Sequence, residues 1–263
     1  MPVVQANGQR LYVEERGPRN APAVVFSHGL LMDHRMFEPQ LQRLASRYRC
    51  IAWDERCHGQ SGGADAPFSY YDSAADLFAL LDHLQIQEAV LVGMSQGGYL
   101  SLRAALRQPQ RVRGLVLLNT QAAPEDPEKM PGYQQMMEDW ARNGLSESTA
   151  ETIATIILGQ GWEGSAAWKA YWRTIGAQAL LQAFHTLGHR DDLSEAVRAI
   201  RCPALAIHGE HDLAISVARA QAMASAIGAP LRVIAGGGHA VNLTHAAQVT
   251  PLIEAFLDQH AGS

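Results

Sequence analysis

The amino-acid sequence predicts an α/β fold in which helices cover both faces of a mostly parallel β-sheet. Short runs rich in Val, Ile and Leu recur along the 263 residues, and most are apolar throughout, as expected of strands that are buried on both faces. Helical patterns lie between these runs, and this alternation is typical of a parallel sheet. A third observation is a glycine-rich turn at 93–98 that joins one apolar run directly to a helical pattern.

Strands are expected where the apolar runs end at turn signals. Their predicted ranges are 11–15, 23–27, 50–54, 89–93, 114–119, 204–209 and 231–235. Helices are expected at 36–46, 70–84, 97–107, 217–226 and about 251–259. Asp72 and Ser73 are good capping residues near the start of the second helix, and Gly228 follows the fourth helix as a C-cap residue.

One long segment, residues 122–190, breaks this alternation. It opens with a Pro-rich, charged connector and contains no clear strand. Helical stretches are separated at 143–144, at 159–164 and at Gly176 or Gly188, so three or four helices are expected. Because the segment is too long for a simple loop, we predict a helical cap at 122–190 that is inserted in a core formed by 1–121 and 191–263.

Composition and charge argue against several classes of function. The net charge of −5 gives no electrostatic reason to expect a nucleic-acid partner. Three cysteines without a CxxC pair predict neither a disulfide framework nor a metal site, but reduced thiols. The N-terminus carries no apolar signal segment, and no uncharged apolar run is long enough to span a bilayer. We therefore expect a cytoplasmic protein without a membrane partner, whose oligomeric state, a homo-oligomer included, stays open.

Ser95 is the candidate nucleophile. It is the central residue of Gly93-Met94-Ser95-Gln96-Gly97, a G-x-S-x-G pattern between an apolar run and a helical pattern. In this setting a sharp turn exposes the serine hydroxyl, and the glycines let the backbone pass close to neighbouring elements. The alternative is a glycine-rich helix N-terminus with a capping serine.

A serine hydroxyl needs a general base, and the base needs a carboxylate that orients it. Asp212 follows the predicted strand 204–209, at the strand end where active-site groups gather in open α/β sheets. His239 follows the predicted strand 231–235 after three glycines. We therefore predict that Ser95, Asp212 and His239 form a catalytic triad.

Each partner of the serine has alternatives nearby in the sequence. Glu210 shares the turn with Asp212 and is the rival acid. His208 and His211 are interpreted as turn residues beside the acid, and His245 as a residue near the start of the last helical region.

Two backbone amides are candidates for an oxyanion hole, which acyl transfer requires. The first is the N–H of Gln96, the residue after the nucleophile. The second is the N–H of Leu30, in the loop that follows the early predicted strand 23–27.

Taken together, these residues resemble the capped α/β-hydrolases, in the branch of esterases, enol-lactonases and carbon–carbon-bond hydrolases. The segments that carry the resemblance, in chain order, are His28-Gly29-Leu30, Asp54-Glu55-Arg56-Cys57-His58-Gly59-Gln60-Ser61, Gly93-Met94-Ser95-Gln96-Gly97-Gly98, Gly209-Glu210-His211-Asp212 and Gly238-His239. The resemblance implies an α/β-hydrolase fold with a sheet of about eight strands. It also implies cofactor-free hydrolysis through an acyl-enzyme, with the catalytic roles on Ser95, Asp212 and His239.

Two positions separate the chain from parts of this superfamily. The family usually has glycine where this chain has Cys57, and that side chain either touches substrate or fills a small buried space. Ser95 stands where haloalkane dehalogenases and most epoxide hydrolases have an aspartate, and a serine at this turn suits acyl substrates.

The predicted cap suggests the substrate. Its aromatic and sulfur-containing residues predict an apolar pocket, for which the substrate-binding candidates are Trp140, Trp162, Trp168, Trp172 and Met136. The alternative is that these side chains pack the cap itself. The predicted function is hydrolysis of a small hydrophobic ester or lactone. A carbon–carbon hydrolase, an acyltransferase or a perhydrolase would use the same triad, and a ligand-binding receptor that retains the triad is the alternative from another class.

Overall fold

The computed structural model describes residues 3–64 and 66–262. At its centre is an eight-stranded sheet with the strand order β1-β2-β4-β3-β5-β6-β7-β8. The strands are β1 (Val3–Ala6), β2 (Gln9–Arg16), β3 (Ala23–Ser27), β4 (Arg49–Trp53), β5 (Ala89–Met94), β6 (Val112–Leu118), β7 (Ala204–Gly209) and β8 (Leu231–Ile234). The β1–β2 and β2–β4 pairs are antiparallel and the other pairs are parallel. The predicted mostly parallel sheet of about eight strands is therefore confirmed.

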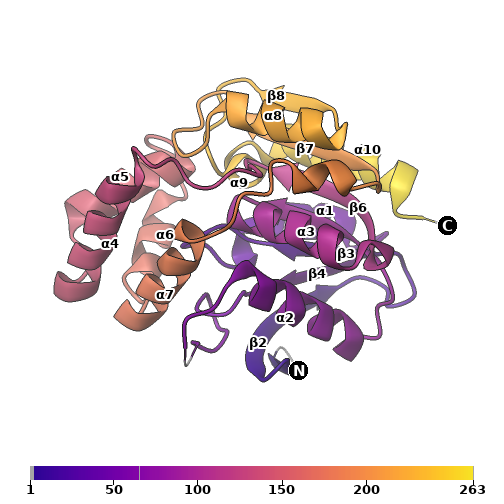
Figure 1. The fold of residues 1–263 in the computed structure, drawn as a ribbon, viewed down its shortest axis with the longest axis horizontal. Coiled ribbons are helices and arrows are strands. Elements are labelled where there is room, and N and C mark those ends of the chain that lie inside the picture. Colours follow the sequence, from indigo (N-terminus) through magenta and orange to yellow (C-terminus); the bar gives the residue numbers. More distant parts are fainter. Residues whose placement is uncertain (1–2, 65, 263) are drawn as a thin grey trace.

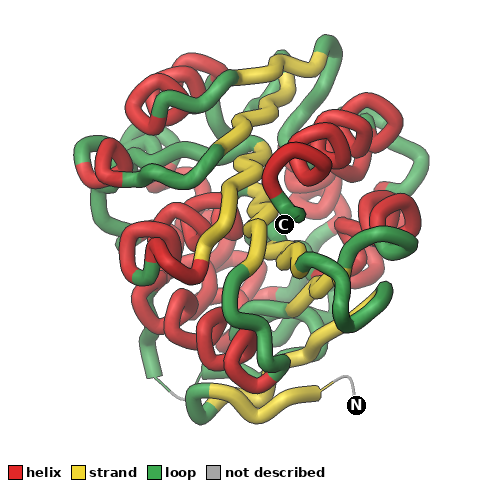
Figure 2. Tube along the Cα trace, turned by 90° about the vertical axis from the view of Figure 1, so that its right-hand side faces the viewer, coloured by secondary structure: helices red, strands yellow, loops and turns green. Residues whose placement is uncertain are grey.

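Helices cover both faces of this sheet, which forms a twisted central layer (Figure 2). The helices of the sheet region are α1 (Glu38–Leu44), α2 (Tyr70–His83), α3 (Gln96–Arg107), α8 (Val217–Ile227), α9 (Val241–Thr244) and α10 (Ala246–His260). Short 3₁₀ helices are η1 (His34–Phe37), η2 (Pro109–Arg111) and η3 (Ala196–Ala199). Helices α2, α3 and α8 pack on one face, while α1 and α10 pack on the other.

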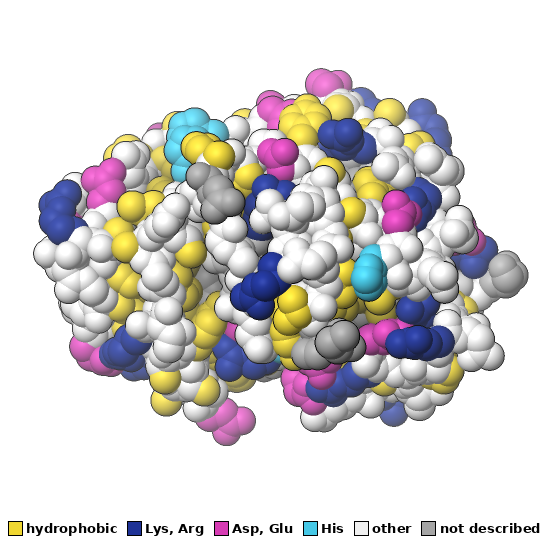
Figure 3. Space-filling view, turned by 90° about the horizontal axis from the view of Figure 1, so that it is seen from below, with side chains coloured by type: hydrophobic (Ala, Val, Ile, Leu, Met, Phe, Trp, Pro, Cys, Tyr) yellow, Lys and Arg dark blue, Asp and Glu magenta, His cyan; other side chains and the backbone are white. Residues whose placement is uncertain are grey.

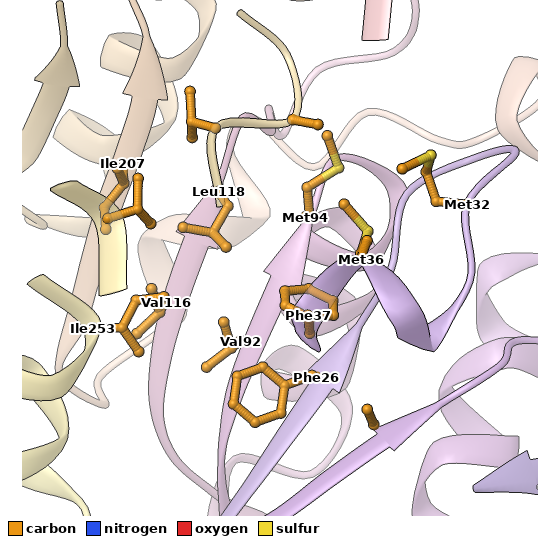
Figure 4. Close-up of a cluster of buried hydrophobic side chains, with 14 of the residues drawn as sticks. Phe26, Met32, Met36, Phe37, Val92, Met94, Val116, Leu118, Ile207 and Ile253 are labelled. Atoms are coloured by element: carbon orange, nitrogen blue, oxygen red, sulfur yellow. The ribbon is translucent and has the colours of Figure 1, made fainter. Parts of the chain in front are cut away.

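The central strands are apolar on both faces because both faces are covered. In β5, Val90 and Val92 join the cluster beneath α1 and α10, whereas Leu91 joins the cluster beneath α2 and α3. Figure 4 shows Val92 with Val116 of β6 and Ile253 of α10 in the first of these clusters. This alternation explains why the strands were recognisable as continuous apolar runs.

Four helices between β6 and β7 stand beside the sheet rather than on its faces (Figure 1). They are α4 (Met130–Asn143), α5 (Glu147–Leu158), α6 (Ser165–Trp172) and α7 (Ala177–Gly188). Side chains of these helices, including Met137, Ile157 and Phe184, belong to the same apolar cluster as Met94 at the end of β5. The inserted helices therefore pack continuously against the carboxyl end of the sheet.

Three local predictions were inaccurate. Strand β1 was missed, because its four residues are too short to give a pattern. The N-cap of α2 is Ser69, while Asp72 supplies the reciprocal bond by accepting from the Ser69 N–H at 2.8 Å. Helix α10 begins at Ala246 and contains Pro251, which had been interpreted as its start.

The distribution of charged side chains and the hydropathy of the helices agree with what the composition predicts. Figure 3 shows basic and acidic side chains interspersed on the face that it displays, without a large patch of one sign. Within residues 3–64 and 66–262, no helix has both the length and the hydropathy that crossing a bilayer requires.

Candidate active site

Ser95 lies in a sharp turn between β5 and α3. Its backbone has φ 53° and ψ −115°, a conformation that L-residues rarely adopt. The Ser95 N–H donates to the Leu118 carbonyl at 2.9 Å, and Thr120 Oγ1 donates to the Ser95 carbonyl at 2.6 Å. A methyl group on Gly97 would collide with the Ser27 carbonyl. The turn is therefore held by neighbouring strands, and it needs glycine where α3 crosses the end of β3.

His239 lies between Ser95 and Asp212, as predicted from the order of the motifs. Its Nε2 is 3.0 Å from Ser95 Oγ, and its Nδ1 is 2.8 and 3.0 Å from the two Asp212 oxygens. The imidazole is only 6% exposed. Because the carboxylate accepts from Nδ1–H, the Nε2 lone pair is directed at the serine hydroxyl, which is the tautomer that a general base needs.

The Asp212 carboxylate is fully buried and is surrounded by hydrogen-bond donors. Besides His239, it accepts from the N–H groups of Ala214 and Ile215 at 2.8 and 3.0 Å, and from Asn119 Nδ2 at 2.9 Å. Burial alone would raise its pKa. The imidazole of His239 and the hydrogen bonds prevail, however, and hold the pKa well below the usual range.

Two residues of this site were missed from the sequence. His208 is not a turn residue but lies buried in β7, with Nε2 3.1 Å from Asp212 Oδ2 and 2.8 Å from the Ile215 carbonyl. Asn119 has φ 46° directly after β6 and joins Asp212 to the Gly238 carbonyl through its amide. Its place at a strand end, on the edge where Ser95 and Asp212 were expected, was the available signal.

The rival residues lie outside this arrangement. Glu210 has a half-exposed side chain that accepts from the Gly236 N–H at 2.9 Å, and so it supports the glycine-rich loop before His239. His211 is exposed, and His245 contacts Thr244 through Nδ1 at 2.9 Å.

The Leu30 and Gln96 amides flank the serine as a candidate oxyanion hole. Leu30 follows β3 and lines the same pocket as Ser95, while Gln96 is the first residue of α3. Within the described residues, neither N–H donates to another protein group. The buried His28 holds the Leu30 loop, because its Nε2 accepts from the Glu55 N–H at 3.0 Å and its Nδ1 donates to the Gly29 carbonyl at 2.9 Å. Both donors therefore remain available to a developing negative charge.

The side chain of Gln96 contacts two buried polar side chains, Glu55 and His58. Gln96 Nε2 donates to Glu55 Oε2 at 2.9 Å and lies 3.4 Å from His58 Nε2. Burial raises the pKa of Glu55 to about 7 and lowers the pKa of His58 to about 3. This buried carboxyl group was not predicted, because a Glu beside an Arg in a sequence is usually a solvated ion pair.

Glu55→Gln is expected to remove a pH-dependent loss of stability. The pKa of Glu55 lies near 7 in the folded chain and near 4.5 without burial, so the folded state binds more protons between these values. The free energy of unfolding therefore falls with rising pH, by an amount on the order of 3 kcal/mol for this group. Urea unfolding at about pH 5 and about pH 8.5 should show this fall in the wild type and a smaller one in Glu55→Gln.

Glu163→Gln is the matched control for this experiment, because Glu163 is an exposed carboxylate on the inserted segment. It should follow the wild type at both pH values. If Glu55→Gln did so as well, Glu55 would be ionised in the folded chain over the whole range.

A pocket opens at Ser95 and His239 between the carboxyl end of the sheet and the inserted helices. Its cavity volume is about 90 Å³. Most of the lining is apolar and comes from the Leu30 loop, β5 and helices α4, α5 and α7; it includes Leu30, Met32, Met94, Met136, Met137, Ile153, Ile157 and Phe184. Such a wall favours a small hydrophobic group beside the serine.

The tryptophan prediction was wrong, since of the five predicted substrate-binding residues only Met136 lines this pocket. Trp140, Trp168 and Trp172 are buried in the apolar cluster, and Trp162 packs at its edge. Trp172 Nε1 donates to the Leu31 carbonyl at 2.8 Å, so this indole attaches α6 to the loop that carries Leu30. Trp168 and Trp172 belong to α6, which contributes no residue to the pocket lining, and Trp162 precedes that helix. Trp140 lies one turn beyond Met136 in α4, past the pocket wall.

Cys57 takes the second of its two predicted roles. It is buried, does not line the pocket, and packs with Phe68 and with Ala183 of α7. Its φ of 66° lies in the left-handed region that favours glycine, the residue that the family resemblance leads one to expect here. Burial raises the pKa of its thiol, which disfavours the reactive thiolate.

Among the described residues, one buried group has ligand atoms close enough together to hold a metal ion: Asp33, His34 and Asp54. Protein donors already occupy these carboxylates. Asp33 pairs with Arg35 at 2.5 Å, and Asp54 accepts from His34 Nδ1 at 2.7 Å and from the Gln60 N–H at 2.8 Å. The group is thus a structural network behind the site.

Comparison with known proteins agrees with the fold. The chain is 34% identical over 152 residues to 3-oxoadipate enol-lactonase 1 of Acinetobacter baylyi, across 57% of this chain and 55% of that relative. The enol-lactonase structure from Burkholderia xenovorans LB400 superposes with a TM-score of 0.89 and 26% identity, over 98% of this chain and 100% of that one. A thermophilic esterase structure from Thermogutta terrifontis gives 0.88 and 25%, over 98% and 97%. The family model of the alpha/beta hydrolase fold matches residues 22–157, and the chain therefore belongs to this family.

Proposed function

We propose that this protein hydrolyses small hydrophobic carboxylic esters or lactones through an acyl-enzyme on Ser95. The observation that carries the proposal is the chain of hydrogen bonds from Ser95 Oγ through His239 to Asp212. Ser95 and His239 of this chain line an apolar pocket. The similarity to esterases and enol-lactonases supports the same reaction class.

In the first half of the reaction, Ser95 Oγ attacks the ester carbonyl carbon while His239 Nε2 takes the hydroxyl proton. The carbonyl oxygen becomes an oxyanion that accepts hydrogen bonds from the Leu30 and Gln96 N–H groups. When this intermediate collapses, the bond to the leaving oxygen breaks, and the protonated His239 gives its proton to that oxygen.

In the second half, His239 takes a proton from water, and the resulting hydroxide equivalent attacks the acyl carbon of the Ser95 ester. The second oxyanion occupies the same hole. Its collapse releases the carboxylic acid and returns the proton from His239 to Ser95 Oγ, so the enzyme ends unchanged. With a lactone, the released alcohol and acid are the two ends of one product.

The inserted segment 122–190 is proposed to act as a cap over this reaction, on a core of 1–121 and 191–263. Helices α4, α5 and α7 supply much of the pocket wall, and the Trp172 bond to the Leu31 carbonyl joins the segment to the proposed oxyanion loop. A cap of this kind excludes water and selects the substrate by size.

The test combines turnover with covalent labelling. Purified protein is assayed on p-nitrophenyl esters from acetate to decanoate and on simple lactones, with a preference for short or medium acyl chains expected. Diethyl p-nitrophenyl phosphate should phosphorylate the peptide that contains Ser95, as mass spectrometry can establish, and should leave Ser95→Ala unlabelled. Absence of turnover on every ester and lactone, or labelling at a different residue, would contradict the proposal.

A further inference from the structure

One wall of the pocket carries a charge that the proposed reaction does not use. Apart from the reacting groups Ser95 and His239, the side chains that line the cavity are apolar, with the exceptions of Tyr133 and Glu125. Glu125 belongs to the connector between β6 and α4. An acidic group in an otherwise apolar wall is costly unless it is paired, and it strongly influences which ligands enter.

Arg190 pairs with Glu125 on the side of the carboxylate that faces away from the cavity. Its Nη2 lies 2.9 Å from Glu125 Oε1 in an ion pair and donates to the Ala123 carbonyl at 2.9 Å, and its guanidinium lies 4.7 Å from the centre of the Tyr99 ring. The Arg190 side chain is 1% exposed, whereas that of Glu125 is 13% exposed. The pair is therefore oriented, with the cation inside the protein and the carboxylate toward the cavity.

The carboxylate keeps a free acceptor on its open side. Within residues 3–64 and 66–262, Glu125 Oε2 has no hydrogen-bond partner in the protein. Arg190 does not line the cavity, so a ligand meets the anion and not the cation. Lys129, the nearby base on the same connector, donates to the Leu213 and Ala214 carbonyls.

We propose that Glu125 determines substrate specificity by rejecting esters that end in a carboxylate and favouring esters that end in a hydrogen-bond donor, such as an ammonium group. The inference rests on the proposed function, since it concerns the substrate of that site. Like charges repel strongly in a cavity with little water, while an ammonium group can donate to the free Oε2.

Three p-nitrophenyl esters of similar length test the proposal: the neutral heptanoate, the anionic hydrogen adipate and the cationic 6-aminohexanoate. For each, kcat/KM is measured for wild type and for Glu125→Gln, which keeps an acceptor for Arg190 without the charge. In the variant, the adipate-to-heptanoate ratio should rise about tenfold and the aminohexanoate-to-heptanoate ratio should fall about tenfold, while heptanoate itself changes by less than about threefold. Using ratios cancels effects on the common chemistry.

Controls separate charge from structure. Glu128→Gln removes an exposed carboxylate from the same connector and should leave both ratios unchanged. Glu125→Asp should preserve the wild-type order of substrates, and Glu125→Leu should shift both ratios as Glu125→Gln does, so the result does not depend on the folding of one variant. Ser95→Ala gives the turnover that does not depend on the serine nucleophile.

The outcomes distinguish this inference from the proposed function. If the wild type turns over none of the three esters, the proposed function fails. If heptanoate is hydrolysed but both ratios stay the same in Glu125→Gln and Glu125→Leu, the specificity role of Glu125 is wrong and the hydrolase stands. A wild type that prefers the adipate ester would also overturn the inference, because Arg190 would then be the group that meets the substrate.

Discussion

Ser95→Ala is expected to lower kcat for the best p-nitrophenyl ester by at least about 10³-fold, and by up to about 10⁶-fold, while KM changes little. The alanine cannot form the acyl-enzyme, so hydrolysis requires direct attack on the ester by a water molecule that no residue has evolved to position. The Leu30 and Gln96 amides would still bind the oxyanion, so a small residual rate above background is expected. Steady-state kinetics on both proteins, prepared in parallel, provide the measurement.

A double variant tests whether Ser95 and His239 act together in the reaction. If Ser95 and His239 act as one unit, as their 3.0 Å contact indicates, then Ser95→Ala/His239→Ala should be no slower than Ser95→Ala alone. Multiplicative losses would mean that the two residues act independently. Full activity in Ser95→Ala would remove Ser95 from the reaction altogether.

Much of the fold was predictable because burial of a strand on both faces produces a continuous apolar run in the sequence. Strand β5 is covered on both faces, so all of its positions are buried and apolar, and the run is visible without knowledge of its neighbours. The helix breaks in the inserted segment were equally visible, because Gly144 and Gly159 end α4 and α5 with positive φ. Strand β1 lies at the sheet edge and left no comparable run.

The arrangement of the site was predictable where the strand ends determine it. Ser95, Asp212 and His239 each follow a parallel strand, and parallel strands bring their carboxyl ends to one edge. Which inserted helices reach the serine, and how far along them the pocket extends, does not follow from such reasoning. The tryptophans were therefore assigned to the pocket, whereas Trp168 and Trp172 belong to α6, which does not line it, and Trp140 lies one turn beyond Met136. Asn119 was missed because its contacts join the ends of β6, β7 and β8, and His208 because its ring contacts the turn that follows its own strand.

Asp212→Asn is expected to lower kcat by about 10⁴-fold, the size of effect found when a triad carboxylate becomes an amide. Every group around Asp212 is a donor, including Asn119 Nδ2 and the Ala214 N–H. An asparagine has one acceptor oxygen, so its NH₂ group must face donors in either orientation. The His239 ring then loses the partner that holds its proton on Nδ1, and its Nε2 ceases to be the base. Unfolding free energy should also fall, by about 2 kcal/mol.

Glu210→Gln is the matched control for Asp212→Asn, because the two carboxylates share one turn and only Asp212 contacts His239. The half-exposed Glu210 accepts a single hydrogen bond, from the Gly236 N–H, which a glutamine oxygen can also accept. Its activity should remain within about threefold of the wild type. The reverse result, with Asp212→Asn active and Glu210→Gln inactive, would assign the orienting role to Glu210. Since the six contacts to Asp212 come from strand ends and turns that the sheet itself holds, only a rearrangement of the loop before His239 could produce that result.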